Sequence, residues 1–192
     1  MDVLQAVKNR RSIRRFKPDA LSRETINEIL DAARLAPSGK NNQPWRFVVV
    51  QNEERETMYA CLEAGLKNAF INGRPTGSAE YSFRIMRDAP ATVFIFNPRD
   101  TAPWTEQTIL ERVMRIVDTQ SVGGAIGNML LRAQELSVGS LWICDIFSAY
   151  EELCAWLGHE GLLVAAVSLG YADEAPPARP RLPLDELVEW RG

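Results

Sequence analysis

Four arginines and a serine stand together in the run Arg10-Arg11-Ser12-Ile13-Arg14-Arg15, near the start of the chain. Guanidinium groups bind phosphate oxygens through paired hydrogen bonds, and a serine hydroxyl adds a neutral donor. This donor set suits one phosphate group. A solvated basic surface and a contact with nucleic acid are the alternatives that composition alone leaves open.

Two further polar stretches could contribute to a binding site. Arg179 and Arg181 flank Pro180 in a tail whose prolines keep the backbone extended, so both side chains project at little entropic cost. The loop from Pro37 to Pro44 carries hydroxyl and amide side chains that can pair with the edge of a heteroaromatic ring without adding charge. The alternatives are that the tail has no binding role and that the loop is an ordinary turn.

The composition argues against several other kinds of chemistry. His159 is the only histidine, which removes a histidine-based metal site and argues against a Ser-His-Asp triad. Cys61, Cys144 and Cys154 form no CxxC motif, so we expect buried free thiols rather than disulfides or a zinc site. The net charge of -3 at pH 7 gives no overall attraction to nucleic acid or to an anionic membrane.

The bulk properties predict one cytoplasmic domain covering residues 1–192, since domains of about 100 to 200 residues are common. No run approaches the roughly 18 apolar residues of a membrane span. The stretch Met1-Asp2-Val3-Leu4 lacks the charged start and apolar run of a signal peptide. We therefore expect no membrane partner.

Hydrophobic periodicity predicts helices and strands that alternate along the chain. Asp2 and Ser22 are suited to cap helices, and Ser148 and Gly158 to begin and end another. The predicted helices cover residues 2–9, the stretch after Ser22, 53–66, 106–135 and the segment from Ser148 to Gly158, and the predicted strands cover 45–50, 91–96, 140–143 and 162–169. Residues 72–77 should form a flexible connection, and the stretch 67–88 carries no recognisable signature. This order predicts an α+β or α/β sandwich whose central sheet has at least four strands covered by helices.

The long helix predicted over residues 106–135 has small residues at its middle, namely Gly123, Gly124, Ala125 and Gly127. Glycine lowers helix propensity but allows another helix or a ligand to approach closely. We expect this helix to pack there against its counterpart in a second copy of the chain.

Four motifs, taken together, carry a family resemblance. RRSIRRF, APSGKNNQPW, VGSLWIC and LGYADEAPPARPRLPLDEL follow one another in the order and spacing of the FMN-dependent nitroreductase family, which the chain resembles over nearly its whole length. The resemblance implies an α+β fold, specifically an α-β-α sandwich around a mainly antiparallel sheet. It also implies a homodimer that holds FMN, non-covalently bound, at the subunit interface.

The resemblance assigns cofactor-binding roles residue by residue. Arg10, Arg11, Ser12 and Arg14 would bind the ribityl chain and phosphate of FMN, and Arg179 and Arg181 would close over the phosphate from the tail. The tail, residues 174–192, would cover either the phosphate or the partner subunit. Pro37, Ser38, Gly39, Asn41 and Gln43 would come from the partner subunit, while Trp142, Ile143 and Cys144, with an extension to Asp145 and Ile146, would run behind the isoalloxazine ring and offer backbone donors to N5 and O4.

The family's chemistry implies ping-pong transfer of hydride from NAD(P)H through flavin N5 to a small acceptor such as a nitroaromatic, quinone or enone. No protein residue is then needed as a catalyst. Trp45, Phe70, Tyr81 or Phe83 could line the acceptor's side of the ring, although aromatic residues of this kind more often belong to the core. The alternatives are a specialised flavin reaction, namely reductive dehalogenation, flavin fragmentation or enoate reduction, and a non-catalytic flavin-binding or sensor protein.

One departure from the family's pattern lies beside the expected ring. Many relatives carry a glycine pair after the strand, whereas this chain has Cys144-Asp145-Ile146-Phe147. The ordinary interpretation of Asp145 is an exposed acid that flanks a helix, and the alternative hypothesis is that it donates a proton.

Overall fold

The computed structural model describes residues 1–192, and at its centre is one antiparallel sheet with strand order β1-β2-β4-β3. The strands are β1 (Arg46–Gln51), β2 (Ala91–Asn97), β3 (Gly139–Ile143) and β4 (Leu162–Gly170). All four were predicted to within one residue at each end. β2 is buried along its whole length and pairs with β1 and β4, so it forms the middle of the core.

Six α-helices surround the sheet, and three short 3-10 helices lie between or after the other elements. The α-helices are α1 (Val3–Asn9), α2 (Arg23–Arg34), α3 (Glu54–Ile71), α4 (Ala79–Asp88), α5 (Ile109–Glu135) and α6 (Tyr150–Leu157), and the 3-10 helices are η1 (Gly39–Asn41), η2 (Asp145–Ala149) and η3 (Leu184–Glu186). Asp2 and Ser22 cap α1 and α2 as predicted. No helix combines the length and the apolar character that crossing a membrane requires.

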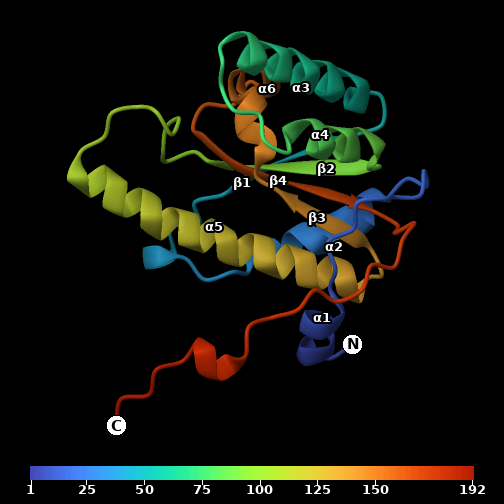
Figure 1. Cartoon of the computed structure of the whole chain (residues 1–192), viewed down its shortest axis with the longest axis vertical. Coiled ribbons are helices and arrows are strands. Elements are labelled where there is room, and N and C mark those ends of the chain that lie inside the picture. The colour runs from blue at the N-terminus through green and yellow to red at the C-terminus, as the bar shows by residue number, and fades with distance from the viewer.

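Two hydrophobic cores lie on opposite faces of the sheet, because successive side chains of a strand point to opposite sides. Val93 and Ile95 of β2 pack with α2 and α5, whereas Phe94 and Phe96 pack with α3, α4 and α6. Figure 1 shows these two helical layers, with α3, α4 and α6 above the sheet and α2 and α5 below it. The predicted α+β sandwich with an antiparallel sheet is therefore confirmed.

Several boundaries differ from the prediction. α3 continues to Ile71 because Ala69 extends its buried face, and α5 begins at Ile109 because Thr108 forms a capping box with Glu111. The prediction that Ser148 caps a helix was wrong. Ser148 lies inside η2, which runs directly into α6, so no free helix end exists at that residue.

α4 was not predicted at all. Its buried residues Ala79, Phe83 and Met86 follow helical spacing, but the turn before the helix and the lack of a side-chain cap at Ser78 leave its start unmarked in the sequence. The helix becomes stable because those side chains pack into the core above the sheet. Gly158, in contrast, ends α6 as predicted, with a left-handed φ of 63°.

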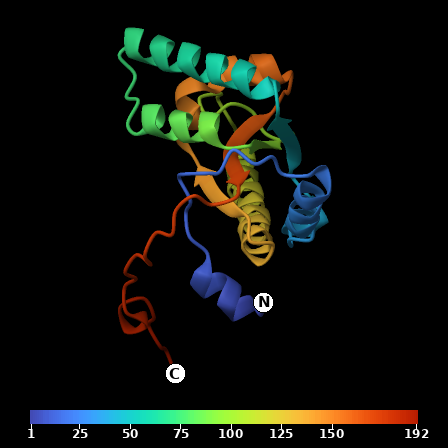
Figure 2. The ribbon, with the colours of Figure 1, turned by 90° about the vertical axis from the view of Figure 1, so that its right-hand side faces the viewer.

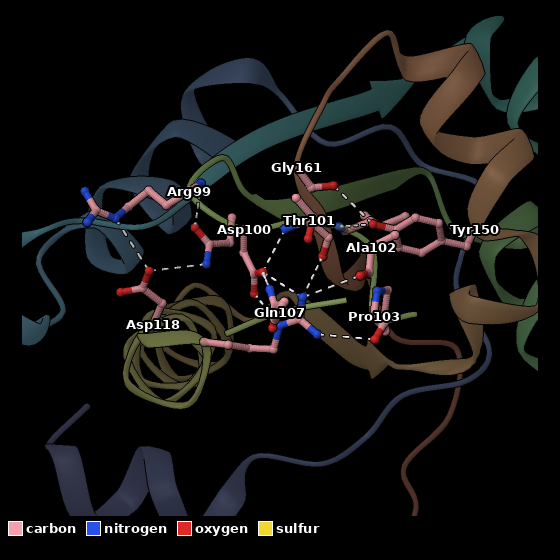
Figure 3. Close-up of polar contacts among 12 residues, drawn as sticks. Arg99, Asp100, Thr101, Ala102, Pro103, Gln107, Asp118, Tyr150 and Gly161 are labelled. Atoms are coloured by element: carbon pink, nitrogen blue, oxygen red, sulfur yellow. Dashed lines mark hydrogen bonds and ion pairs between the residues drawn. The ribbon is translucent and has the colours of Figure 1, made fainter. Parts of the chain in front are cut away.

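The connection between β2 and α5 is held by a partly buried ion pair. Both oxygens of the Asp100 carboxylate accept hydrogen bonds from the Arg115 guanidinium at 2.7 Å, and Gln107 Nε2 donates to one of them at 2.7 Å (Figure 3). Burial raises the pKa of Asp100, but the hydrogen bonds, led by those from Arg115, outweigh it and leave the pKa lowered. This cluster fixes the start of the long helix.

The segment after α1 and the start of the tail run side by side at the β3 edge. Ile13 N donates to Ser140 O at 3.0 Å, and Lys17 N donates to Tyr171 O at 2.8 Å. Beyond these bridges the tail leaves the body of the chain, with α1 beside its first part (Figures 1 and 2). Two stretches more than 150 residues apart in the sequence are therefore neighbours.

Candidate functional site

A cavity of about 330 Å³ lies between the end of α1, the segment that follows it and the tail. We call it the cationic cavity. Its lining residues are Val7, Lys8, Arg10, Arg11, Ser12, Arg14, Pro176, Pro177, Ala178, Arg179 and Arg181. The structure thus brings together both arginine-bearing stretches that the sequence singled out.

The cations of this cavity have no acidic partners. Neither Lys8 nor any of the five lining arginines is within 4.0 Å of a carboxylate oxygen, and their hydrogen bonds go to nearby backbone carbonyls. The pKa of Arg10 is lowered, first by burial and then by repulsion from Arg181 and Arg11. An anion in the cavity would relieve this repulsion.

Glu174 ties the tail to the segment after α1, and sequence reasoning missed it. Its Oε1 accepts hydrogen bonds from the backbone N–H groups of Arg14 and Arg15, and its Oε2 lies 3.6 Å from Arg15 Nε. Arg15 does not line the cationic cavity. Glu174 therefore fixes the walls of the cavity without neutralising the guanidinium groups that face it.

A second cavity, of about 320 Å³, lies between the end of β3 and α4, and we call it the β3 cavity. It is lined by Arg14, Ser78, Tyr81, Ser82, Ile85, Leu141, Trp142, Ile143, Cys144 and Asp145. Arg14 lines both cavities, so the two are adjacent. The predicted residues Trp142, Ile143 and Cys144 thus lie together at one wall, although Ile143 is itself buried in the core.

The thiol of Cys144 is partly exposed at this wall, but its pKa is raised, mainly by burial and then by the charge of Asp145. A raised pKa keeps the thiol protonated at neutral pH and makes it a poor nucleophile. Cys144 can therefore shape the cavity, but it is unsuited to covalent catalysis.

The loop with Pro37, Ser38, Gly39, Asn41 and Gln43 lines neither cavity and packs instead against α5. Gly39 N donates to Ser121 Oγ at 3.3 Å, and a Cβ on Gly39 would lie 2.5 Å from a methyl carbon of Val117. Lys40, Asn41 and Gln43 all have positive φ angles, of 52°, 56° and 47°. The loop is closely held in one chain, but away from the other predicted site residues.

The aromatic candidates divide into two groups. Trp45 and Phe83 are buried in the two cores, so the hypothesis that either lines a substrate surface was wrong. Packing against the helices on each side of the sheet explains their burial. Tyr81 is 56% exposed and lines the β3 cavity, while Phe70 is exposed at the end of α3.

Asp145 is neither an exposed acid nor an isolated one. The hydroxyls of Ser78 and Ser82, both from α4, donate hydrogen bonds to its Oδ2 atom. Sequence reasoning missed these two serines because α4 itself was not predicted. Asp145 thus connects the two walls of the β3 cavity.

Comparisons with known proteins agree with this architecture. The family model described as "Nitroreductase family" matches residues 7–171. A crystal structure of a nitroreductase-type protein in complex with FMN, from Desulfovibrio desulfuricans, superposes with a TM-score of 0.76 at 31% identity and covers 100% of this chain and 98% of that one.

Two curated relatives extend the comparison. The NADH dehydrogenase of Thermus thermophilus is 29% identical over 203 residues, covering 100% of this chain and 97% of its own. The iodotyrosine deiodinase of Thermotoga neapolitana is 28% identical over 187 residues, covering 91% and 90%. With the family model matched along most of its length, this chain belongs to the nitroreductase family of oxidoreductases.

Proposed function

We propose that this chain binds FMN non-covalently and uses NAD(P)H to reduce a small acceptor such as a nitroaromatic, quinone or enone. The observation that carries the proposal is the set of six unpaired cations around the cationic cavity, joined through Arg14 to the β3 cavity. FMN has a phosphate at one end and a flat ring system at the other. The donor chemistry of the two cavities fits those two ends.

In this proposal the residues have binding and orienting roles. Arg10, Arg11, Ser12 and Arg14 hold the phosphate and ribityl chain, and Arg179 and Arg181 close over the phosphate from the tail. When bound, FMN supplies hydride chemistry at N5, accepting from NAD(P)H and passing to the acceptor in alternating half-reactions. Backbone N–H groups at Trp142–Cys144 orient the ring, and the side chains of Leu141 and Ile85 exclude water from one side of the β3 cavity.

We also propose that the chain is a homodimer whose contact surface is one stripe of α5. Ile109, Val113 and Ile116 are 84%, 49% and 59% exposed along this stripe. It continues over Gly124 and Gly127, where an added Cβ would meet no atom within 4 Å. Such an apolar surface with small residues at its centre suits a second helix of the same kind.

The position of the Pro37–Gln43 loop supports the same proposal. The loop contacts α5 at Ser121, whereas Trp142 of the β3 cavity approaches α5 at Gly123. Residues two apart on an α-helix point in nearly opposite directions, so α5 separates the loop from the cavity within one chain. We propose that the loop, and the exposed apolar side chains of tail residues 174–192, complete the site of the partner.

The test begins with the absorbance spectrum of the native protein and mass analysis of the released chromophore. We expect a yellow protein that releases FMN, is bleached by NADH or NADPH without oxygen, and is reoxidised by a nitroaromatic. A protein that binds FMN but reacts with neither would be a flavin-binding protein without turnover. A colourless protein that does not bind added FMN would refute the proposal.

Reductive dehalogenation is the second candidate, favoured by the similarity to the iodotyrosine deiodinase over 91% of this chain. The discriminating measurement is halide release. If reduced protein releases iodide from an iodinated phenol faster than it reduces nitroaromatics, the second candidate replaces the first.

A further inference from the structure

The β3 cavity has two walls from separate parts of the fold, and Asp145 is hydrogen bonded across them. Asp145 is the first residue of η2, directly after the β3 wall, while Ser78, Tyr81 and Ser82 belong to the start of α4. Ser78 Oγ donates to Asp145 Oδ2 at 2.8 Å, and Ser82 Oγ donates to the same oxygen. The two walls are thus joined through one carboxylate oxygen.

This contact substitutes for an ordinary helix cap. Ser78 occupies the N-cap position of α4, but its side chain makes no hydrogen bond to the backbone of the helix. The carboxylate of Asp145 lies at this end instead, where the helix dipole favours a negative charge. Ser82, one turn later, is only 9% exposed, so its hydroxyl needs an internal partner.

At its start, α4 has one small side chain in the core, that of Ala79, and no side-chain cap on its backbone. It follows a turn with two left-handed glycines, Gly73 and Gly77, around whose Cα positions an added Cβ would meet no atom within 4 Å. The later part of α4, in contrast, is anchored by Phe83 and Met86 in the core. The hydrogen bonds to Asp145 therefore hold the end of the helix that carries Tyr81.

We propose that Asp145 is a positioning residue that sets the width of the β3 cavity, and so determines which acceptors fit, by holding the start of α4 and Tyr81 against the end of β3. The inference rests on the proposed function, because it assigns acceptor selection to the same site. Asp145 acts here as a hydrogen-bond acceptor, not as a source of protons.

Two substitutions separate these roles. Both serines donate to a single oxygen, so the amide oxygen of Asp145→Asn can accept both hydrogen bonds, although the variant has no carboxyl proton to give. Asp145→Ala removes the acceptor as well. A positioning residue is therefore rescued by asparagine, and a proton donor is not.

The first measurement uses the flavin-free protein. Hydrogen exchange of the amides at the start of α4 should be about tenfold faster in Asp145→Ala, as expected for the loss of a helix cap, and close to wild type in Asp145→Asn. The double variant Ser78→Ala with Ser82→Ala should behave like Asp145→Ala, which keeps the test valid if Asp145→Ala does not fold. Ser22→Ala, which loses the cap of α2 below the sheet, is the matched control and should leave α4 exchange unchanged.

The second measurement compares acceptors on the FMN-loaded protein. Asp145→Ala should raise kcat/KM for a bulky nitroaromatic relative to a compact one by about fivefold to tenfold, mainly through KM, because the cavity is no longer held at one width. Asp145→Asn should keep the wild-type ratio and the wild-type pH profile. Ser22→Ala should also keep the ratio, although its stability is lower.

Three outcomes test the positioning role of Asp145 and the proposed function on which it rests. Unchanged α4 exchange together with unchanged acceptor selectivity in Asp145→Ala overturns the inference. Equal loss of activity in Asp145→Asn and Asp145→Ala, with one limb of the pH profile missing, makes Asp145 a proton donor and also overturns it. A wild-type protein that is not bleached by NAD(P)H refutes the proposed function instead, and exchange in the flavin-free protein still decides whether Asp145 holds α4.

Discussion

The cationic cavity makes a quantitative prediction about Arg10 and Arg181, which come from opposite ends of the chain. Replacing either with glutamine removes a guanidinium but keeps a polar side chain. A hydrogen bond to a charged group contributes about 1.5 to 3 kcal/mol, equivalent to roughly 10-fold to 150-fold in Kd. Arg181 is exposed and screened by solvent, so we expect about a tenfold loss of FMN affinity there, and a loss nearer 100-fold at the partly buried Arg10.

The same arginines repel each other when no anion is bound. The pKa of Arg10 is lowered first by burial and next by Arg181, so removing Arg181 relieves an unfavourable interaction in the flavin-free protein. Arg181→Gln should consequently leave the thermal stability of the flavin-free protein equal or higher while it weakens FMN binding. A variant that binds FMN more weakly but is at least as stable as the wild type identifies a binding residue, because loss of a structural residue would lower both affinity and stability.

The assay is a titration of the flavin-free protein with FMN, in which the quenching of flavin fluorescence reports binding. Raising the salt from about 0.05 M to about 0.5 M should weaken FMN binding to the wild type more than to a variant with both Arg10→Gln and Arg181→Gln, because fewer charges remain in the variant to be screened. Arg191→Gln is the matched control: Arg191 lies in the same tail, pairs with Glu189 at 2.8 Å and does not line the cavity. Wild-type FMN affinity in Arg10→Gln and Arg181→Gln, or an equal loss of affinity in Arg191→Gln, would refute phosphate binding by Arg10 and Arg181.

Three further predictions concern stability, each measured by urea unfolding. Gly65→Ala places a Cβ 2.3 Å from the Cβ of Ala149 and should lower the free energy of unfolding by about 1 to 3 kcal/mol, and wild-type stability would show that α3 and η2 can separate without loss. Ser22→Ala should cost about 1 kcal/mol by removing the cap of α2, and no change would mean that the cap contributes nothing. Asp100→Asn should lower the free energy of unfolding by about 1.5 to 3 kcal/mol at pH 7, because Arg115 loses a partly buried charged partner. The pKa of Asp100 is lowered in the folded state, so the stability that its charge contributes is fully present above the ordinary pKa near 4 and is lost as the pH falls through the lowered value. The difference in unfolding free energy between the wild type and Asp100→Asn should therefore vanish at low pH. A difference that does not depend on pH would contradict a stabilising role for the Asp100 charge.

The strands were the most predictable part of this fold. Runs such as Ala91–Phe96 are apolar and β-branched, and they stay buried on both faces wherever helices cover the sheet. α4 was missed although its buried residues follow helical spacing, because turn-forming residues precede it and Ser78 makes no side-chain cap, so no local signal marks the start of the helix. Ser148 failed as a cap for a related reason: its hydroxyl is suited to a helix start, but the preceding residues were already in a helical turn.

The candidate site likewise has a part that the local sequence predicted and a part that depends on long-range pairing. The composition of each arginine stretch indicated phosphate chemistry, but their convergence depends on bridges between Ser12 and Ser140 and between Phe16 and Ala172. Such long-range pairing is set by the whole sheet and has no local signature. The contribution of the partner's loop and the dimer stay predictions.

Two carboxylates, Glu174 and Asp145, explain how the site keeps its charge. An acid close to so many arginines would ordinarily neutralise one of them and weaken the attraction for a phosphate. Glu174 avoids this because it accepts a hydrogen bond from the backbone N–H of Arg14 and pairs with Arg15, which does not line the cationic cavity. Asp145 likewise accepts serine hydroxyls and forms no ion pair with Arg14, although both line the β3 cavity. In both cases negative charge fixes the walls while the guanidinium groups stay free, and a substitution that allowed either acid to reach Arg14 should weaken FMN binding even with every predicted arginine in place.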